Sequence, residues 1–252
     1  MLVVTTVAGA ATGIGALPLL VRRSISHRTY DAALGLAAGV MTGASVFGLL
    51  IPGVETGTLL QVTVGVLLGT GTLLVGNRVI PHVHARYRGW RHHGRPADLD
   101  TTSRLRRAVL IGGAIVLHNV PEGLAIGIAF AAGLEEIALF LAVVIALQNV
   151  PDGFAFAVPV AETGLSRARL VIYTTLSGLL PQLLASIVGF GLVAVAAGAF
   201  PVAAGFAAGA MLGVVSREVI PSSHGHGHAD AATATFVLGV ILILLAEEVL
   251  VA

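Results

Sequence analysis

The sequence predicts an all-α fold, a polytopic membrane helix bundle with eight transmembrane helices, in which residues 1–252 form a single transmembrane domain. Composition is the first reason, because 56% of the residues are hydrophobic and only 11% are charged, against about 25% charged in soluble domains. The second reason is that apolar residues gather in stretches of about 20, the length that spans a bilayer. The third is the placement of the arginines. This composition excludes a soluble enzyme and a nucleic-acid-binding protein, so no nucleic-acid partner is expected.

The predicted spans follow one another with short connections. The first apolar stretch precedes its arginines, the reverse of a secretory signal, so we expect it to be retained as a span. The boundary between the sixth and seventh spans is the least distinct, because only Ala-Gly-Ala-Phe-Pro interrupts the apolar run there. The eight stretches are residues 2–21, 32–53, 58–80, 107–131, 136–160, 170–195, 201–220 and 232–252.

The basic residues orient this arrangement. All fourteen are arginine, and counting from an outside N-terminus they fall only in inside connections or the adjoining helix ends. Arginine excess marks the cytoplasmic side, so we expect both termini outside. The plasma membrane of a prokaryote is the simplest location, with membrane lipids as the surroundings. The arginines are Arg22, Arg23, Arg28, Arg78, Arg86, Arg88, Arg91, Arg95, Arg104, Arg106, Arg107, Arg167, Arg169 and Arg217.

Two copies of one hexapeptide stand near the middle of neighbouring spans. The fourth span contains His118-Asn-Val-Pro-Glu-Gly123, and the fifth contains Gln148-Asn-Val-Pro-Asp-Gly153, thirty residues later. The first and fifth residues of each copy share a helix face, and the second is three residues from the carboxylate. Ionisable residues inside a span are costly and indicate a functional site.

The chemistry of these copies favours a divalent cation. Imidazole and carboxylate ligands suit zinc, iron and manganese, and the absence of cysteine excludes a thiolate site. Each proline lacks an N–H, so a backbone carbonyl is freed beside the polar residues. The alternative is a polar helix–helix contact without an ion. The repetition of the whole pattern favours the ion site.

These motifs resemble the prokaryotic branch of the ZIP (ZRT/IRT-like) family of divalent metal transporters. The resemblance extends to Leu34–Met41, Val79–His84, Ala208–Leu212 and Glu218–Pro221. It implies a metal site formed by His118, Glu122, Gln148 and Asp152, with Asn119 and Asn149 in a second site that shares the carboxylates. It also implies a homodimer and elevator-type alternating access, in which spans one, four, five and six move against the others.

Three positions depart from the family pattern. Asp152 stands where glutamate is usual, Arg217 precedes Glu218 where histidine is usual, and the sixth-span stretch Ser177–Gln182 contains no acid. Asp is one methylene shorter and a ligand carboxylate is missing, so we expect a single dominant site that is weaker or differently selective. Glu218 and the cytoplasmic tract of His224, His226 and His228 are further metal-ligand candidates, since histidine-rich tracts bind metals. For that tract, a flexible polar loop is an equal alternative.

The predicted function is transport of a divalent transition-metal cation (zinc, iron, manganese or cadmium) toward the cytoplasm, without enzymatic activity or a prosthetic group. Two alternatives remain open. An intramembrane zinc-dependent hydrolase would need three protein ligands and an open water position, which His118, Glu122 and Asp152 could supply. A non-transporting metal sensor would bind the ion without carrying it across.

Overall fold

The computed structural model describes residues 1–21, 25–79, 118–161, 164–196 and 198–250, which are helical throughout apart from short turns and contain no strand. The helices are α1 (Leu2–Ala10), the 3₁₀ turn η1 (Ala11–Ala16), α2 (Leu17–Val21), α3 (His27–Ser45), the π-helical turn η2 (Val46–Leu50), α4 (Ile51–Thr56), α5 (Leu59–Val79), a helix at 118–131, α8 (Glu135–Ala161), α9 (Arg167–Val195), α10 (Phe200–Val214), the π-helical turn η4 (Val215–Val219), α11 (Ile220–Ser223) and α12 (Ala229–Leu250).

The predicted fold class is confirmed. Within the described residues, seven helical segments are long and apolar enough to cross a membrane. They correspond to every predicted span except the fourth. The described part of that span is the helix at 118–131, and residues 107–117 lie outside the described residues.

Among the helices that begin earlier than the apolar stretches predict, α3 and α9 are each started by a polar residue. α3 begins at His27, where the Ser26 hydroxyl accepts a hydrogen bond from the Thr29 amide at 3.1 Å. α9 begins at Arg167, capped in the same way by Ser166. Serine caps satisfy amides that the first helical turn leaves without partners, whereas hydropathy marks only the apolar part of a helix.

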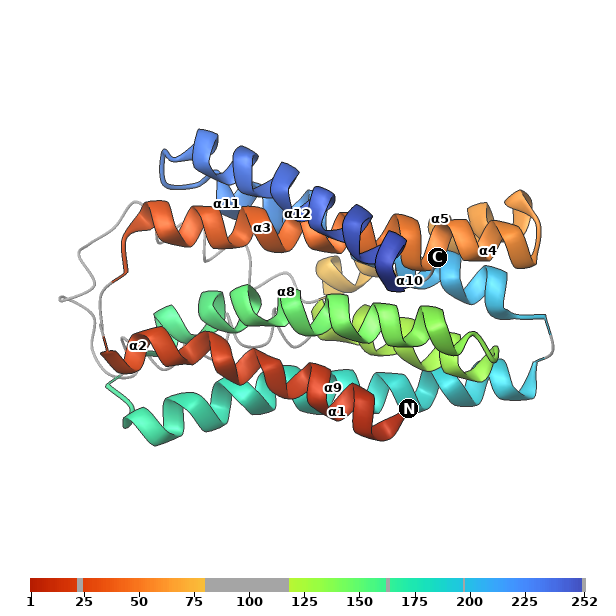
Figure 1. Ribbon diagram of the computed structural model, residues 1–252, viewed down its shortest axis with the longest axis horizontal. Coiled ribbons are helices and arrows are strands. Elements are labelled where there is room, and N and C mark those ends of the chain that lie inside the picture. Colours follow the sequence, from red (N-terminus) through yellow and green to blue (C-terminus); the bar gives the residue numbers. More distant parts are fainter. Residues whose placement is uncertain (22–24, 80–117, 162–163, 197, 251–252) are drawn as a thin grey trace.

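The helices form two groups that lie along the long axis of the molecule (Figure 1). The first helix group consists of α1, η1, α2, the helix at 118–131, α8 and α9, which pack on one another. In the second helix group, α12 packs on α3 and α5 packs on α10, with η2, α4, η4 and α11 completing it. The first helix group contains the described residues of predicted spans one, four, five and six, and it packs extensively on the second group through α8 and α3.

Glycines let the first group pack with its backbones in close approach. A Cβ at Gly153 would lie 1.8 Å from the carbonyl oxygen of Thr12, and one at Gly123 would lie 2.1 Å from that of Gln182. No side chain fits at either distance. Such contacts suit helices in lipid, where association depends on close van der Waals packing. They bring η1 against α8, and the helix at 118–131 against α9.

The seam between the two groups is mainly apolar. α3 packs against α8, and one buried cluster joins Val40 and Met211 of the second group to Ile126, Phe140 and Ile145 of the first. None of these side chains requires a specific hydrogen-bond partner across the seam. The two groups therefore meet on a surface held mainly by packing.

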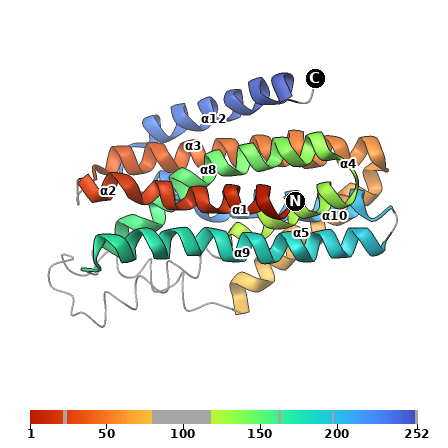
Figure 2. The ribbon, with the colours of Figure 1, turned by 60° about the horizontal axis from the view of Figure 1, so that its bottom comes forward.

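The connections gather at the two ends of the molecule. Figures 1 and 2 show α3, α9 and α12 all beginning at one end, while the turns at 57–58, 132–134 and 198–199 lie at the other. α1 begins and α12 ends toward that second end. Two of its turns use Gly133 and Gly198 at φ 77° and 81°, a backbone conformation that glycine adopts readily. This arrangement is the one expected of antiparallel spans.

Candidate metal site

The fourth-span copy of the hexapeptide faces the second helix group through its histidine. The Nε2 atom of His118 contacts an oxygen of Glu218 in a short hydrogen bond. Glu218 is buried in η4, the π-helical turn that ends at Val219 before Pro221. π-helical turns inside longer helices often occur at functional sites. The contact joins two residues 100 positions apart, from different helix groups.

The carboxylate of the same copy points into the first group. Glu122 is fully buried, and its Oε1 accepts a hydrogen bond of 2.6 Å from the side-chain amide of Gln148 on α8. The bond connects the two hexapeptide copies directly. Gln148 is likewise fully buried. The structure therefore brings these two predicted ligands together, from neighbouring helices.

The fifth-span copy faces α1 and α9 through its asparagine. The amide nitrogen of Asn149 donates to the backbone carbonyl of Ala8 and to the Oε1 atom of Gln182, both at 2.8 Å. Asn119, its counterpart in the fourth span, is 2% exposed. Asp152, the carboxylate of this copy, is half-buried. The copies thus share a sequence pattern but have different neighbours.

Several buried polar atoms of this region have no hydrogen-bond partner in the part of the chain that the structure describes. They come from η1, the helix at 118–131, α8 and α9, all in the first helix group. Almost all buried polar groups in proteins are paired, so each exception needs an explanation. A cation or water held among the oxygens would satisfy the oxygens, and water would satisfy the amide nitrogen, which can only donate. The unpaired atoms are Thr12 Oγ1, Glu122 Oε2, Gln148 Oε1, Asn149 Oδ1 and Gln182 Nε2.

The charged residues alone do not surround one point. Among the described residues, no group of three or more His, Asp or Glu side chains is placed to hold a metal ion. The Nε2 atom of His118 contacts Glu218, while Asp152 is close enough to interact electrostatically with both His118 and Glu122. An ion held by the predicted ligands would replace the His118–Glu218 contact and would also take oxygens from the two amide side chains.

Gln182 is the buried residue that sequence reasoning did not include. It is fully buried on α9, one residue after Pro181, and contacts the predicted ligand Asn149. The signal was present, since a polar side chain beside a proline inside a span is unusual. The stretch Ser177–Gln182 drew attention only because it contains no acid.

The three histidines between α11 and α12 make separate local contacts. Nδ1 of His224 lies 2.9 Å from the hydroxyl of Ser223, in the same turn. Nδ1 of His226 lies 2.7 Å from a carboxylate oxygen of the fully buried Asp31. The ring of His226 also stacks on His27, with centroids 4.6 Å apart. The three candidate ligands of this tract, which include the exposed His228, are not gathered around one point.

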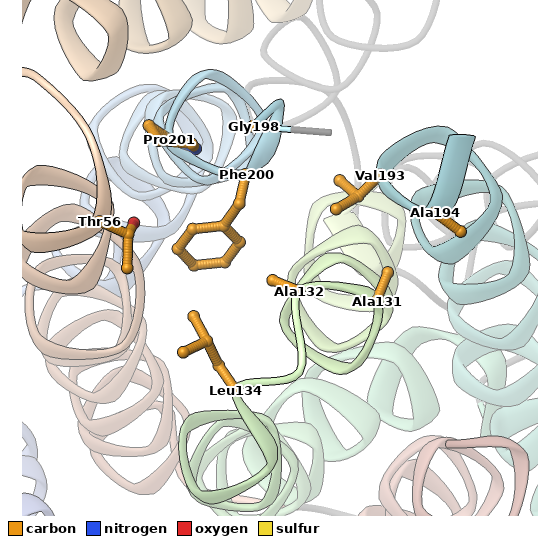
Figure 3. A pocket seen from close by; sticks show the side chains of 9 residues that line it. All are labelled: Thr56, Ala131, Ala132, Leu134, Val193, Ala194, Gly198, Phe200 and Pro201. Atoms are coloured by element: carbon orange, nitrogen blue, oxygen red, sulfur yellow. The ribbon is translucent and has the colours of Figure 1, made fainter. Parts of the chain in front are cut away.

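A cavity of about 400 Å³ lies elsewhere, between the two groups at the end that carries the turns. In Figure 3 the Phe200 ring and the Leu134 side chain face each other across it, with Thr56 of α4 beside them. No charged side chain lines the cavity. It offers no ligand for a cation, and the hexapeptide copies remain the candidate site.

Comparison with known proteins identifies the family. Residues 91–247 match the profile of the family described as ZIP Zinc transporter. The chain is 35% identical to the zinc transporter GufA of Myxococcus xanthus, over 98% of this chain and 97% of that protein. It is 41% identical to the zinc transporter ZIPB of Bordetella bronchiseptica, over 96% and 78% of the two chains. The human zinc transporter ZIP11 is 30% identical over 92% of both chains. With its helical membrane fold and its paired hexapeptides, the chain belongs to the ZIP family.

Proposed function

We propose that this protein transports divalent transition-metal cations, zinc foremost, across the plasma membrane of a prokaryote toward the cytoplasm. The ion binds between the helix at 118–131 and α8. The observation that carries the proposal is the set of buried oxygens without hydrogen-bond partners in the described residues, contributed by Glu122, Gln148 and Asn149. Buried oxygens of this kind are the atoms that a bound cation would satisfy.

The ligand chemistry and the relatives both favour zinc. The related proteins are named as zinc transporters, and zinc binds imidazole nitrogen and carboxylate oxygen well. The same ligands accept iron, manganese and cadmium, which we keep as further substrates. The ligands are His118, Glu122, Gln148 and Asp152, with Asn119 and Asn149 beside them.

Charge balance favours one ion at a time. Glu122 and Asp152 together neutralise one divalent cation, which offsets part of the cost of burying all three charges. Gln182 is neutral, so α9 contributes no further negative charge at this depth. A second cation among the same residues would leave uncompensated positive charge away from water.

The contact between His118 and Glu218 supports alternating access. The His118 nitrogen that contacts Glu218 is occupied and unavailable to zinc. Because the two residues belong to different helix groups, zinc binding that frees His118 would also loosen one link between the groups. The mainly apolar seam then permits the first group to move against the second. Glu218 is in place to meet the ion on its way toward the cytoplasm.

The arginine distribution supports both termini outside, with the starts of α3, α9 and α12 at the cytoplasmic end. Exposed apolar side chains such as Leu67 and Leu245 are available to membrane lipids. By resemblance to the family, we propose that the protein forms a homodimer. We propose transport without catalysis, and neither an intramembrane hydrolase nor a non-transporting sensor is favoured by a specific observation.

Zinc entry into proteoliposomes that carry an internal zinc-sensitive dye tests the proposal. We expect saturable entry for the wild type, and entry at the protein-free rate for His118→Ala and Asp152→Ala. His27→Ala and Asp230→Ala are matched controls outside the site and should retain wild-type entry. Zinc binding without entry would favour the sensor. Neither binding nor entry would contradict the proposal and leave the hexapeptides as a structural joint.

A further inference from the structure

A glutamine on α9 contacts a predicted zinc ligand without being one itself. Gln182 is fully buried, and its side-chain oxygen lies 2.8 Å from the amide nitrogen of Asn149 on α8. The backbones around it leave little space, because a Cβ at Gly123 would lie 2.1 Å from the carbonyl oxygen of Gln182. The backbone of Gln182 is thus held against the helix that carries the fourth-span ligands.

The hydrogen bonds of Asn149 fix which way its amide points. Its nitrogen lies 2.8 Å from the carbonyl oxygen of Ala8, which can only accept, so that side of the amide must be the donor. The Gln182 atom that lies 2.8 Å from the same nitrogen must then be its oxygen. The two protons of the Asn149 amide are both used, one by each partner.

This arrangement leaves the carbonyl oxygen of Asn149 directed away from both partners. That oxygen is buried and has no hydrogen-bond partner within the described residues. The terminal torsion of an asparagine side chain is broad and has no sharply preferred value. With only the Ala8 bond the amide would pivot, whereas two bonds hold it at one angle. The oxygen is therefore presented in a fixed direction.

We infer that Gln182 is a positioning residue for zinc, which holds the carbonyl oxygen of Asn149 at the ion by accepting a hydrogen bond from its amide. The inference rests on the proposed function. Glutamine suits the role because it offers an acceptor without adding a negative charge to a buried site that already holds Glu122. A hydrogen bond that serves only helix packing would connect the same two residues, so the test must separate orientation of the ligand from stability.

Two substitutions separate a role in orienting Asn149 from a role in helix packing. For each variant, the KM and the maximal rate of zinc entry are measured in proteoliposomes. Gln182→Met keeps the length and loses the acceptor, and should raise KM about tenfold, in the range for residues that orient metal ligands, with a maximal rate within about twofold of wild type. Gln182→Glu keeps an oxygen acceptor at the same reach and should give a KM at or below the wild-type value. Gln61→Met makes the same change at a half-buried glutamine near the start of α5 and is the control.

A double variant tests whether Gln182 acts through Asn149. Gln182→Met should add nothing to the KM of Asn149→Ala, because the oxygen that it positions is then absent. Independent, multiplied effects would overturn the inference. It would also fall if Gln182→Glu behaved like Gln182→Met, or if Gln182→Met lowered only the maximal rate.

Zinc affinity, measured on the detergent-purified protein, distinguishes a failure of the positioning role from a failure of the transport proposal. If wild-type protein shows no saturable entry, the transport proposal fails, yet Gln182→Met should still weaken zinc binding about tenfold relative to wild type. Equal affinity of the two proteins would overturn the positioning role whether or not zinc is transported.

Discussion

The two hexapeptide copies share one sequence pattern and differ in what surrounds them. The fourth-span copy reaches the second helix group, where His118 contacts Glu218. The fifth-span copy stays within the first group, where Asn149 bonds to α1 and α9. A hydrogen bond from Gln148 to Glu122 joins the copies.

This difference separates zinc binding from the movement of one helix group against the other. Residues that bond only within the first group can set how tightly zinc is held, because their partners move with them. His118 also contacts the other group, so a change there should affect both zinc binding and the movement. Substitutions in each group therefore test whether binding and movement are separable in this way.

The largest effect should follow from Glu122→Gln. The carboxylate is fully buried and bonded to Gln148, and the substitution removes its charge while keeping its shape. Without that charge a divalent cation in the site is poorly balanced, so zinc entry should fall by about 100-fold or more. Entry is measured in proteoliposomes. Glu55→Gln, an exposed position at the end of α4, should leave it unchanged.

A smaller loss is expected from Asp152→Asn, by about tenfold to 100-fold. Asp152 is half-buried, so water can replace part of its interaction with the ion. The loss should appear mainly in KM, because Asp152 belongs to the first group. Asp230→Asn is the control, at an exposed aspartate in the first turn of α12. A loss confined to the maximal rate would contradict the division of tasks.

Glu218→Gln should alter movement more than binding. Glu218 contacts His118 across the two groups, so the substitution weakens a link between them while leaving the ligands of the first group in place. We expect the maximal rate of zinc entry to change about tenfold, a typical coupling between sites. Zinc affinity, measured by equilibrium dialysis, should change less than about threefold. The opposite pattern would make Glu218 a ligand of the main site.

The smallest effect is expected from replacing His224, His226 and His228 together by alanine. In the structure His224 and His226 already have local partners, Ser223 and Asp31. Zinc entry at saturating concentration should stay within about twofold of wild type. A tenfold loss of zinc entry would show that the tract is part of the transport path. It would contradict the statement that the two hexapeptides and their neighbours set binding and movement.

The sequence was sufficient for the fold class and for seven of the predicted spans, because both depend on local signals. The length of an apolar stretch predicts a transmembrane span, and a polar cluster inside that stretch predicts a functional site. The contact from His118 to Glu218 could not be predicted in this way, since it depends on which helices become neighbours and how each is rotated. The π-helical turn that carries Glu218 leaves no mark in hydropathy.

Gln182 shows a different limit. Comparison with the family pattern drew attention to an acid that this chain does not have, and the glutamine in the same stretch was passed over. Only the packing of α9 against α8 and the helix at 118–131 reveals that its side chain meets Asn149. Helix starts were also misplaced, because the serine caps at Ser26 and Ser166 are polar.

The most direct test of the central proposal is the position of bound zinc. Crystals of the protein grown with zinc, measured at the zinc absorption edge, should give an anomalous peak between the helix at 118–131 and α8. It should lie about 2.0–2.2 Å from an imidazole nitrogen of His118 and a carboxylate oxygen of Glu122. Peaks confined to the tract that contains His224, with none between the two hexapeptides, would contradict it.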